Sequence, residues 1–423
     1  MILYDSKSNV VELEPQPFAS GGEGDVYHIK SSNVYKKCCV KIFKPGKIDS
    51  RFDKLEYMIK HPLNLPDNPH YRICWPLDFV YQDGKPVGFI MPLAFEKSNS
   101  FYSLLNKDTS SIYDRTKAMG VVNRMKLLYN VVYALSNLHR YGYVMVDFKP
   151  VNLLFTDIGQ ISFLDIDSIQ ISEDDRMIFS PTAVTAEYAY PKEIANIANR
   201  KPCSQFWDVY GFAIVAYQII LGIHPFVAWT SMKTPGGNEI TDRVDLMKYN
   251  LYPHGKNSRY IEKIPEPHYY VYLLPESLRN LFARTFDLED NTVNISEWLT
   301  VLMDCINSGK IKENPFTKRP IPPVFILKNT LPSHAMCGEN ITLNWHSVKN
   351  TRLTINGKSI DPGKGSFTVE LPKGLKITVV HGDDKVTYRQ EYTFHQAACF
   401  CINCGVEYQD PSDVFCYNCG VRR

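Results

Sequence analysis

The segment DVYGFAIVAYQIILG, residues 208–222, is apolar on every side when it is written as a helix. A helix of this kind must be buried all round, so the chain has to build a large helical core about it. No stretch of the sequence is apolar enough to span a bilayer. We therefore expect the helix at residues 208–222 to lie in the interior of a folded domain. Because 423 residues exceed what one hydrophobic core usually supports, we expect two or three domains.

The secondary-structure signals change along the chain. The first ~95 residues contain short β-rich runs such as CCVKIF and PVGFIMP, whereas residues 124–142 carry apolar side chains at helical steps of three and four. Residues 312–323, KENPFTKRPIPP, are rich in proline and charge and predict a linker. Alternating segments separated by turns follow, with the spacing of a small antiparallel β-sandwich in which Trp345 is a candidate core residue.

Four of the 11 cysteines form the pattern C-x2-C-x11-C-x2-C. They are Cys401, Cys404, Cys416 and Cys419. Four thiolates at this spacing suit tetrahedral Zn²⁺, which would stabilise a segment too short for its own core; disulfides or free thiols are the alternative. Without an open coordination position the site would be structural and would serve docking to another protein. Arg422 and Arg423 are the only basic residues around it, which disfavours nucleic-acid binding.

The charge and the first residues exclude some classes of function. A formal charge of +2 gives no overall electrostatic reason to expect nucleic acid or an anionic membrane as a partner. The first residues, MILYDSKSNVVELEPQ, include early acids and no long apolar run, which argues against a secretory signal. The other cysteines are scattered, which favours buried thiols in a reducing compartment, so a cytoplasmic protein is expected.

Residues 18–27, FASGGEGDVY, join two extended segments and supply glycine where a backbone would approach phosphate oxygens closely. Alone, such a loop is more often an ordinary hairpin. Lys41 lies on the next predicted strand, where its ammonium could contact phosphates, and Glu56 is the only glutamate between Lys41 and residue 96 that could hold it. The alternative for Lys41 is a solvated strand lysine.

Residues 143–155, YVMVDFKPVNLLF, place Asp147, Lys149 and Asn152 in one loop, and Asp165 follows thirteen residues after Asn152. Phosphoryl transfer needs a carboxylate for the hydroxyl proton, a lysine for the transferred phosphate and oxygen ligands for Mg²⁺. In this order, together with the glycine-rich loop and its lysine, the motifs resemble a eukaryotic-like Ser/Thr protein kinase over about the first 310 residues.

The resemblance assigns roles to individual residues. Its ATP-binding residues would be Gly21, Gly22, Gly24, Val26, Lys41, Glu56, Met91, Leu93, Ala94 and Leu154. Its catalytic residues would be Asp147, the base, and Lys149, with Asn152 and Asp165 as magnesium ligands. Met91 would be the gatekeeper, the Ala94 N–H the adenine donor and Leu154 the floor of the pocket. Asp208 resembles the buried helix aspartate that anchors the catalytic loop.

Several positions depart from the family's pattern, four of them at the catalytic loop and the metal-binding turn. Met145 and Val146 replace a histidine and an arginine, and Ile166 and Asp167 replace a phenylalanine and a glycine. Methionine can fill the space of a packing histidine, whereas Val146 removes the usual receptor for a phosphate on the activation segment. Asp167 lacks the backbone freedom of glycine and is expected to restrict that segment. We therefore predict a working kinase that is not switched in the usual way, with a nucleotide-binding pseudokinase scaffold as the alternative.

The loop also suggests a substrate class. Its D-x-K-P-x-N form resembles Ser/Thr kinases, and TAEYAYP, residues 185–191, resembles the end of an activation segment. A protein substrate is therefore favoured over a small molecule. Thr182 and Thr185 are candidates for autophosphorylation, and the alternative for each is a hydrogen-bonded turn residue.

Over the whole chain the resemblance is to bacterial kinases associated with tellurite-resistance systems, which occur with a PP2C-type phosphatase and a von Willebrand A-type protein. It implies those two proteins as partners, besides a protein substrate, and neither nucleic acid nor membrane. The implied cofactors are ATP, Mg²⁺ or Mn²⁺, and a structural Zn²⁺. The implied α+β architecture is a bilobal kinase with an N-lobe at 1–95 and a C-lobe at 96–312, a linker at 313–322, an immunoglobulin-like β-sandwich at 323–396 and a zinc ribbon at 397–423.

Overall fold

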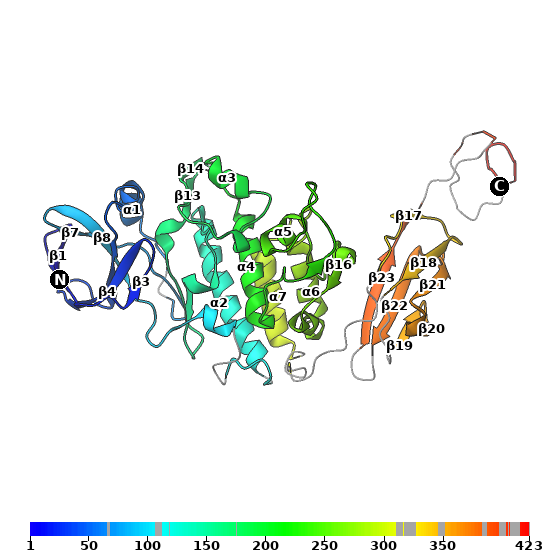
Figure 1. The fold of residues 1–423 in the computed structure, drawn as a ribbon, viewed down its shortest axis with the longest axis horizontal. Helices are drawn as coiled ribbons and strands as arrows, with labels where there is room; N and C mark the ends of the chain where they lie inside the picture. Colours follow the sequence, from blue (N-terminus) through cyan, green and yellow to red (C-terminus); the bar gives the residue numbers. More distant parts are fainter. Residues whose placement is uncertain are drawn as a thin grey trace. The chain divides into compact units, whose positions relative to one another are not determined.

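The computed structural model describes most of the chain. The described residues are 1–65, 68–105, 112–117, 119–174, 176–309, 316, 327–345, 352–382, 387–396, 403–404, 406 and 415–422. The fold has two compact units, drawn in Figure 1. One comprises Met1–Lys256 and Lys263–Lys318, and the other comprises Asn257–Glu262 and Arg319–Arg423. Of the predicted linker, only residue 316 lies within the described part.

The first unit begins with an antiparallel sheet. Its described strands follow the order β2-β1-β7-β8-β5-β4-β3, with a further pairing of β2 with β4. These strands are β1 (Ile2–Asp5), β2 (Val10–Leu13), β3 (Ala19–Ser20), β4 (Gly24–Ser31), β5 (Cys38–Phe43), β7 (Asp78–Gln82) and β8 (Lys85–Pro92). Helix α1 (Phe52–Lys60) turns Lys54, Leu55 and Met58 inward. The β-rich start predicted from the sequence is confirmed.

Helices dominate the rest of the first unit, where α2 packs against α4 and α7 (Figure 1). The helices are α2 (Gly120–Arg140), α3 (Ile194–Ala198), α4 (Gln205–Leu221), α5 (Arg243–Lys248), α6 (Glu276–Thr285) and α7 (Ile295–Asn307). Every residue of α4 from Phe206 to Leu221 is buried, as its apolar pattern predicted, and Gly222 ends the helix with a φ of 77°. No helix in the described part of the chain is long and apolar enough to cross a membrane.

Two small sheets accompany these helices, with the orders β6-β12-β11-β9 and β10-β13-β14. The strands are β6 (Tyr71–Ile73), β9 (Asn99–Ser100), β10 (Tyr143–Val144), β11 (Leu153–Phe155), β12 (Ile161–Phe163), β13 (Gln170–Glu173) and β14 (Arg176–Phe179); β15 (Trp229–Thr230) and β16 (Ile261–Lys263) lie further along the chain. The loop between β10 and β11 holds residues 145–152, and the turn after β12 holds residues 164–169. Both loops are thus fixed at each end by a short strand.

The second unit contains short strands around one apolar core. They are β17 (His334–Ala335), β18 (Asn340–Asn344), β19 (Arg352–Ile355), β20 (Lys358–Ile360), β21 (Ser366–Glu370), β22 (Lys376–Gly382), β23 (Thr387–Thr393) and β24 (His395–Gln396). β18 pairs with β21, the order β20-β19-β22-β23 forms a second sheet, and β17 pairs with β24. Trp345 is fully buried in this core, as predicted, and its Nε1–H donates to the Pro362 carbonyl at 2.9 Å. The immunoglobulin-like assignment stays a prediction.

Candidate active site

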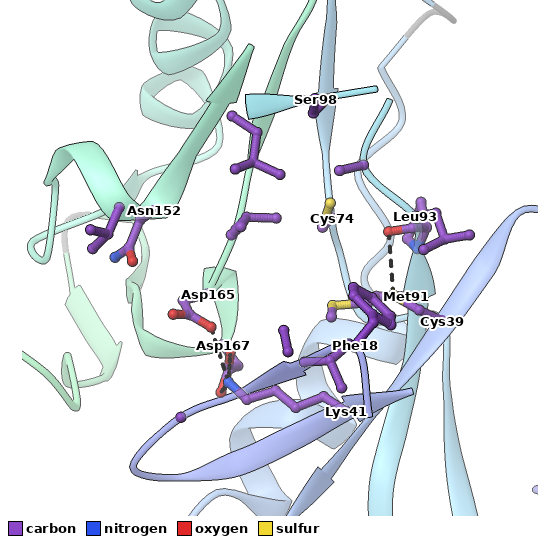
Figure 2. Close-up of a pocket in the computed structure, with 18 of the residues that line it drawn as sticks. Phe18, Cys39, Lys41, Cys74, Met91, Leu93, Ser98, Asn152, Asp165 and Asp167 are labelled. Carbon is purple, nitrogen blue, oxygen red and sulfur yellow. Dashed lines mark hydrogen bonds and ion pairs between the residues drawn. The ribbon is translucent and has the colours of Figure 1, made fainter. Parts of the chain in front are cut away.

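A cavity of about 970 Å³ is lined both by the N-terminal sheet and by the loops that follow β10 and β12. Figure 2 shows its interior, with Lys41 and Asn152 reaching into it from opposite sides. Of the residues predicted from the sequence, its wall contains Gly21, Gly22, Gly24, Val26, Lys41, Met91, Leu93, Ala94, Asp147, Lys149, Asn152, Leu154 and Asp165. Glu56 is not part of that wall. The fold therefore gathers groups from distant parts of the sequence around one space.

The loop between β10 and β11 is anchored by Asp208, which is fully buried on α4. Its carboxylate accepts the backbone N–H groups of Met145 at 2.7 Å and Val146 at 3.0 Å, and His139 Nε2 lies 2.9 Å away. Val146 has a φ of 61°, a left-handed conformation that is unfavourable for a β-branched residue. The two hydrogen bonds hold the backbone in this conformation, so the predicted anchoring role of Asp208 is confirmed.

Asp147 is buried and both of its carboxylate oxygens have partners. Lys149 Nζ lies 2.7 Å from Oδ2, and the Thr185 hydroxyl donates to Oδ1 at 2.7 Å. Lys149 Nζ also donates to Thr185 Oγ1 at 3.0 Å, so the three side chains form a closed triangle. Thr185 thus fits the alternative named for it from the sequence, a hydrogen-bonded residue. The triangle fixes a carboxylate and an ammonium side by side at the cavity wall.

Asn152 and Asp165 supply the oxygen ligands that Mg²⁺ prefers. The Asn152 amide nitrogen donates to the Asp147 carbonyl at 2.9 Å, and Figure 2 shows the amide oxygen on the side that faces Asp165. The Asp165 side chain is 57% exposed, and its backbone has a φ of 52°. A neutral amide oxygen and an accessible carboxylate in one cavity therefore fit a hydrated divalent cation.

Lys41 is buried at the centre of the sheet-side wall and is bound by two carboxylates (Figure 2). Its Nζ lies 2.9 Å from Asp167 Oδ1, 3.0 Å from Asp167 Oδ2 and 3.3 Å from Asp165 Oδ1. Burial by itself would lower the pKa of Lys41, but the two carboxylates raise it above its ordinary value. Burial likewise would raise the pKa of Asp167, yet the Lys41 ammonium holds it below its ordinary value. Both groups are therefore charged at neutral pH.

A family model described as the protein kinase domain matches residues 16–306, more than half of the chain. This chain belongs to the protein kinase family. The bilobal kinase fold predicted from the sequence is thereby confirmed for that part of the chain.

Several curated kinases are similar to parts of this kinase. Citron Rho-interacting kinase of Mus musculus is 24% identical over 161 residues, 37% of this chain and 7% of that protein. The 3-phosphoinositide-dependent protein kinase 1 of Arabidopsis thaliana is 26% identical over 146 residues, covering 31% and 29%. A probable serine/threonine-protein kinase of Streptomyces coelicolor is 23% identical over 215 residues, covering 49% and 29%. The chain spans less than a third of the length of these relatives. The name of the Streptomyces coelicolor protein supports the predicted class, protein-serine/threonine kinase.

The predicted pairing of Lys41 with Glu56 is wrong. Glu56 lies on the solvent side of α1 and pairs with Lys60 at 2.9 Å. Residues two positions apart in a helix point about 200° apart, so turning Lys54 inward turns Glu56 outward. In this kinase Asp167 provides the carboxylate for Lys41 instead. The aspartate that stands in place of the family's glycine thus has a partner across the cavity.

The adenine side of the cavity contains the predicted hinge residues. Met91 is buried at the end of β8, and the Leu93 N–H donates to the Lys37 carbonyl at 2.9 Å. The Leu93 carbonyl accepts from Arg72 Nη1 at 2.7 Å, which fixes the strand exit where Ala94 follows. Phe18, which the sequence analysis did not select, also lines the cavity and stacks on His28 with ring centroids 4.0 Å apart. The sequence signal that could have identified Phe18 as a cavity residue was an apolar side chain just before the glycines of the loop.

The predicted zinc site belongs to the second unit. The Sγ atoms of Cys404, Cys416 and Cys419 lie within 4.8 Å of one another, and those of Cys404 and Cys416 are 3.5 Å apart. Tetrahedral ligands about 2.3 Å from Zn²⁺ are about 3.8 Å from each other, so the three thiols fit such an ion. Cys401, the fourth predicted ligand, lies outside the described residues.

Proposed function

We propose that this kinase transfers the γ-phosphate of ATP, with Mg²⁺, to serine or threonine hydroxyls of proteins. One observation carries the proposal, namely the meeting of all the groups that phosphoryl transfer needs in one cavity. Those groups are Lys41, Asp147, Lys149, Asn152 and Asp165. The family match and the names of the similar proteins support the same reaction class.

Each of these side chains has a role that its surroundings support. When bound, ATP supplies the phosphoryl group and Mg²⁺ neutralises its charge, with Asn152 and Asp165 as the residues that would hold the metal. Asp147 takes the proton of the acceptor hydroxyl. Lys149, 2.7 Å from the Asp147 carboxylate, balances charge on the transferred group. Lys41, oriented by Asp167, contacts the remaining phosphates.

The reaction does not depend on the family's usual phosphate receptor on the catalytic loop. Val146 occupies that position, and its side chain is buried and uncharged. The closed triangle of Asp147, Lys149 and Thr185 already orders the base and the lysine. We therefore propose a kinase whose catalytic loop is ordered before any phosphate is added.

The alternative function is a nucleotide-binding pseudokinase scaffold. The full engagement of the Asp147 carboxylate favours this alternative, because a base must be free to accept a proton. Incubation with Mg²⁺ and γ-labelled ATP, beside an Asp147→Ala variant, distinguishes the two. Label on the protein or on an added Ser/Thr substrate that requires Asp147 supports the kinase. ATP binding without label in either protein supports the scaffold.

The β-sandwich and the zinc site are proposed as modules for docking partner proteins, among them a PP2C-type phosphatase and a von Willebrand A-type protein, in the cytoplasm. The clustering of three cysteine thiols supports a structural Zn²⁺. Metal analysis should find about one zinc per chain, and Cys416→Ser should lose it. Cys337→Ser is the matched control, because Cys337 is an exposed free thiol of the same unit and should retain the metal. Equal zinc content in both variants would contradict the site.

A further inference from the structure

Lys54 lies on the face of α1 that turns toward the interior of the kinase. It is 4% exposed, and its Nζ donates to the backbone carbonyl of Ser180 at 3.4 Å. Within the described residues, no carboxylate lies within ion-pair distance of this ammonium. Moving a charged amine out of water without a close counter-ion costs free energy, so burial favours the neutral amine. Whether Lys54 is charged therefore depends on charges that lie farther away.

Charged groups on α1, in the glycine-rich loop and in the turn after β12 act on Lys54. Asp167 and Glu23 attract its ammonium, and Arg51 repels it. The attraction by Glu23 is screened by solvent, because its side chain is 38% exposed, and Glu23 already pairs with Arg51. Arg51 is buried and also donates to the Thr182 hydroxyl. Burial, opposed by Asp167, lowers the pKa of Lys54 to about 7, so both forms of the amine are populated near neutral pH.

Asp167 connects Lys54 to the cavity. Asp167 and Lys41 line the cavity wall, whereas Lys54 is not part of that wall. The Asp167 carboxylate oxygens lie 2.9 and 3.0 Å from Lys41 Nζ, a contact drawn in Figure 2. Burial would raise the pKa of Asp167, but Lys41, Arg51 and Lys54 together hold it below its ordinary value. One buried carboxylate is thus shared by three cations, and a change at one of them changes the attraction left for the others.

The phosphates of ATP would change this balance at Lys41. A lysine ammonium that contacts phosphate oxygens is shared between them and its carboxylate. The negative charge of Asp167 would then be less compensated by Lys41 and would attract the Lys54 ammonium more strongly. The charge of the phosphates acts in the same direction over a longer distance. Both effects favour the charged form of Lys54.

We propose that Lys54 is a positioning residue of the nucleotide site that takes up a proton from solvent when the phosphates of ATP bind at Lys41. The proton adds to the neutral amine, and the water or buffer acid that donates it is the one group that loses a bond. The charged Lys54 then holds Asp167, and Lys41 is left to the phosphates. The coupling rests on the proposed function only in requiring that ATP binds.

The coupling fixes how the affinity for ATP should depend on pH. Below pH 7 Lys54 is mostly charged before ATP arrives, so little proton is taken up. Above pH 7 the free kinase has lost the proton that the complex retains, and the affinity for ATP falls as the pH rises. Adenosine, which carries no phosphate, should bind without proton uptake.

The test is calorimetric titration of Mg²⁺ and ATP into the full chain carrying Asp147→Ala, so that bound ATP is not turned over. Two buffers of different ionisation enthalpy give the number of protons taken up. We expect about half a proton or more per ATP at pH 8, and a Kd for ATP that rises roughly tenfold from pH 7 to pH 9. Adenosine serves as the ligand without charge.

Substitutions of Lys54 in the same chain separate its charge from its packing. Lys54→Met should take up no proton and keep its Kd for ATP within about twofold between pH 7 and pH 9. Lys54→Arg keeps a positive charge at both values, so it should bind ATP at pH 9 as the unsubstituted residue does at pH 7. Lys60→Met is the matched control, because Lys60 is a surface lysine of α1 that pairs with Glu56. Titration of the nucleotide itself is common to all variants and cancels in the comparison.

The coupling is overturned if Lys54→Met and Lys60→Met show the same proton uptake and the same rise of Kd with pH. ATP binding itself would in that case still support the proposed function. A thermal melt verifies that each variant is folded. If Lys54→Met fails to fold, Lys54→Arg decides alone, and a Kd that still rises tenfold overturns the coupling. A folded chain that binds no ATP at either pH would overturn the proposed function and the coupling together.

Discussion

The two sides of the kinase cavity differ in how far their buried charges are neutralised. On the catalytic-loop side, the fully buried Asp208 carboxylate accepts two backbone N–H groups and contacts a histidine. On the α1 side, buried cations outnumber buried carboxylates. The positive charges of Arg51 and Lys54 are only partly neutralised, by Asp167 and by solvent screening. On the side that positions the reacting groups the buried carboxylate is hydrogen-bonded, whereas the α1 side keeps buried positive charge that is only partly neutralised.

The largest effect on stability should come from Asp208→Ala, which removes the buried hydrogen-bond acceptor on the catalytic-loop side. This change leaves the Met145 and Val146 N–H groups and the His139 ring buried without their acceptor, and it releases the strained backbone at Val146. We expect the free energy of unfolding to fall by about 3–5 kcal/mol, measured by urea denaturation, together with loss of kinase activity.

The control for that experiment is Asp304→Ala, because Asp304 is an exposed carboxylate on α7. It should change the free energy of unfolding by less than about 0.5 kcal/mol. Equal destabilisation by the two alanine variants would mean that Asp208 does not anchor the catalytic loop.

A smaller effect should distinguish the two carboxylates that could serve Lys41. Asp167→Asn removes the charge 2.9 Å from the Lys41 ammonium, whereas Glu56→Gln removes a charge that pairs with Lys60 on the surface. We expect kcat/KM for ATP to fall roughly 10- to 100-fold in Asp167→Asn, because the lysine loses its orientation. Glu56→Gln should stay within about twofold of the unmodified kinase. The reverse order would restore Glu56 as the partner of Lys41.

The smallest effect should come from removing the excess charge with Lys54→Met, which keeps a long side chain without the ammonium. The folded-state pKa of Lys54, about 7, lies below its ordinary 10.5, so between these values the unfolded chain binds the proton more tightly. The destabilisation by Lys54 is fully present below pH 7 and is lost as the pH rises toward 10.5. Lys54→Met should therefore stabilise the kinase by about 1–3 kcal/mol at pH 6.

Urea denaturation of both proteins at pH 6 and pH 9 checks the sign of this effect. The stability difference should be smaller at pH 9, where Lys54 is already neutral in the folded kinase. A difference that stays the same at the two values would show that Lys54 acts through packing and not through its charge.

The residues on the catalytic-loop side could be predicted from the sequence because they lie close to one another along the chain. Asp147, Lys149 and Asn152 lie within six consecutive residues, so the short strands on either side are enough to place them together. The burial of α4 was equally readable, because an apolar surface on every face leaves a helix only one environment. The hairpin between β19 and β20 was predictable for a similar reason, since Asn356 and Gly357 both adopt positive φ as such turns require.

The partner of Lys41 could not be predicted in the same way. The choice between Glu56 and Asp167 depends on which face of α1 turns inward, and lysine is normally among the last residues to be buried. Lys54 shares the buried face of α1 with Leu55 and Met58, and Leu55 packs against apolar residues of the sheet. The rotation of a short helix is decided by its contacts with other segments, here the strands of the sheet and the Ser180 carbonyl, and not by the pattern within the helix.

The pairing of Lys41 with Asp167 has a consequence for small-molecule inhibition. In kinases whose lysine is held by a glutamate of the corresponding helix, moving that helix breaks the ion pair and inactivates the enzyme. Here both members of the pair lie outside α1, on β5 and in the turn after β12. A compound that displaces α1 would therefore leave the ion pair between Lys41 and Asp167 intact. Selective inhibitors of this kinase should instead target the carboxylate of Asp167.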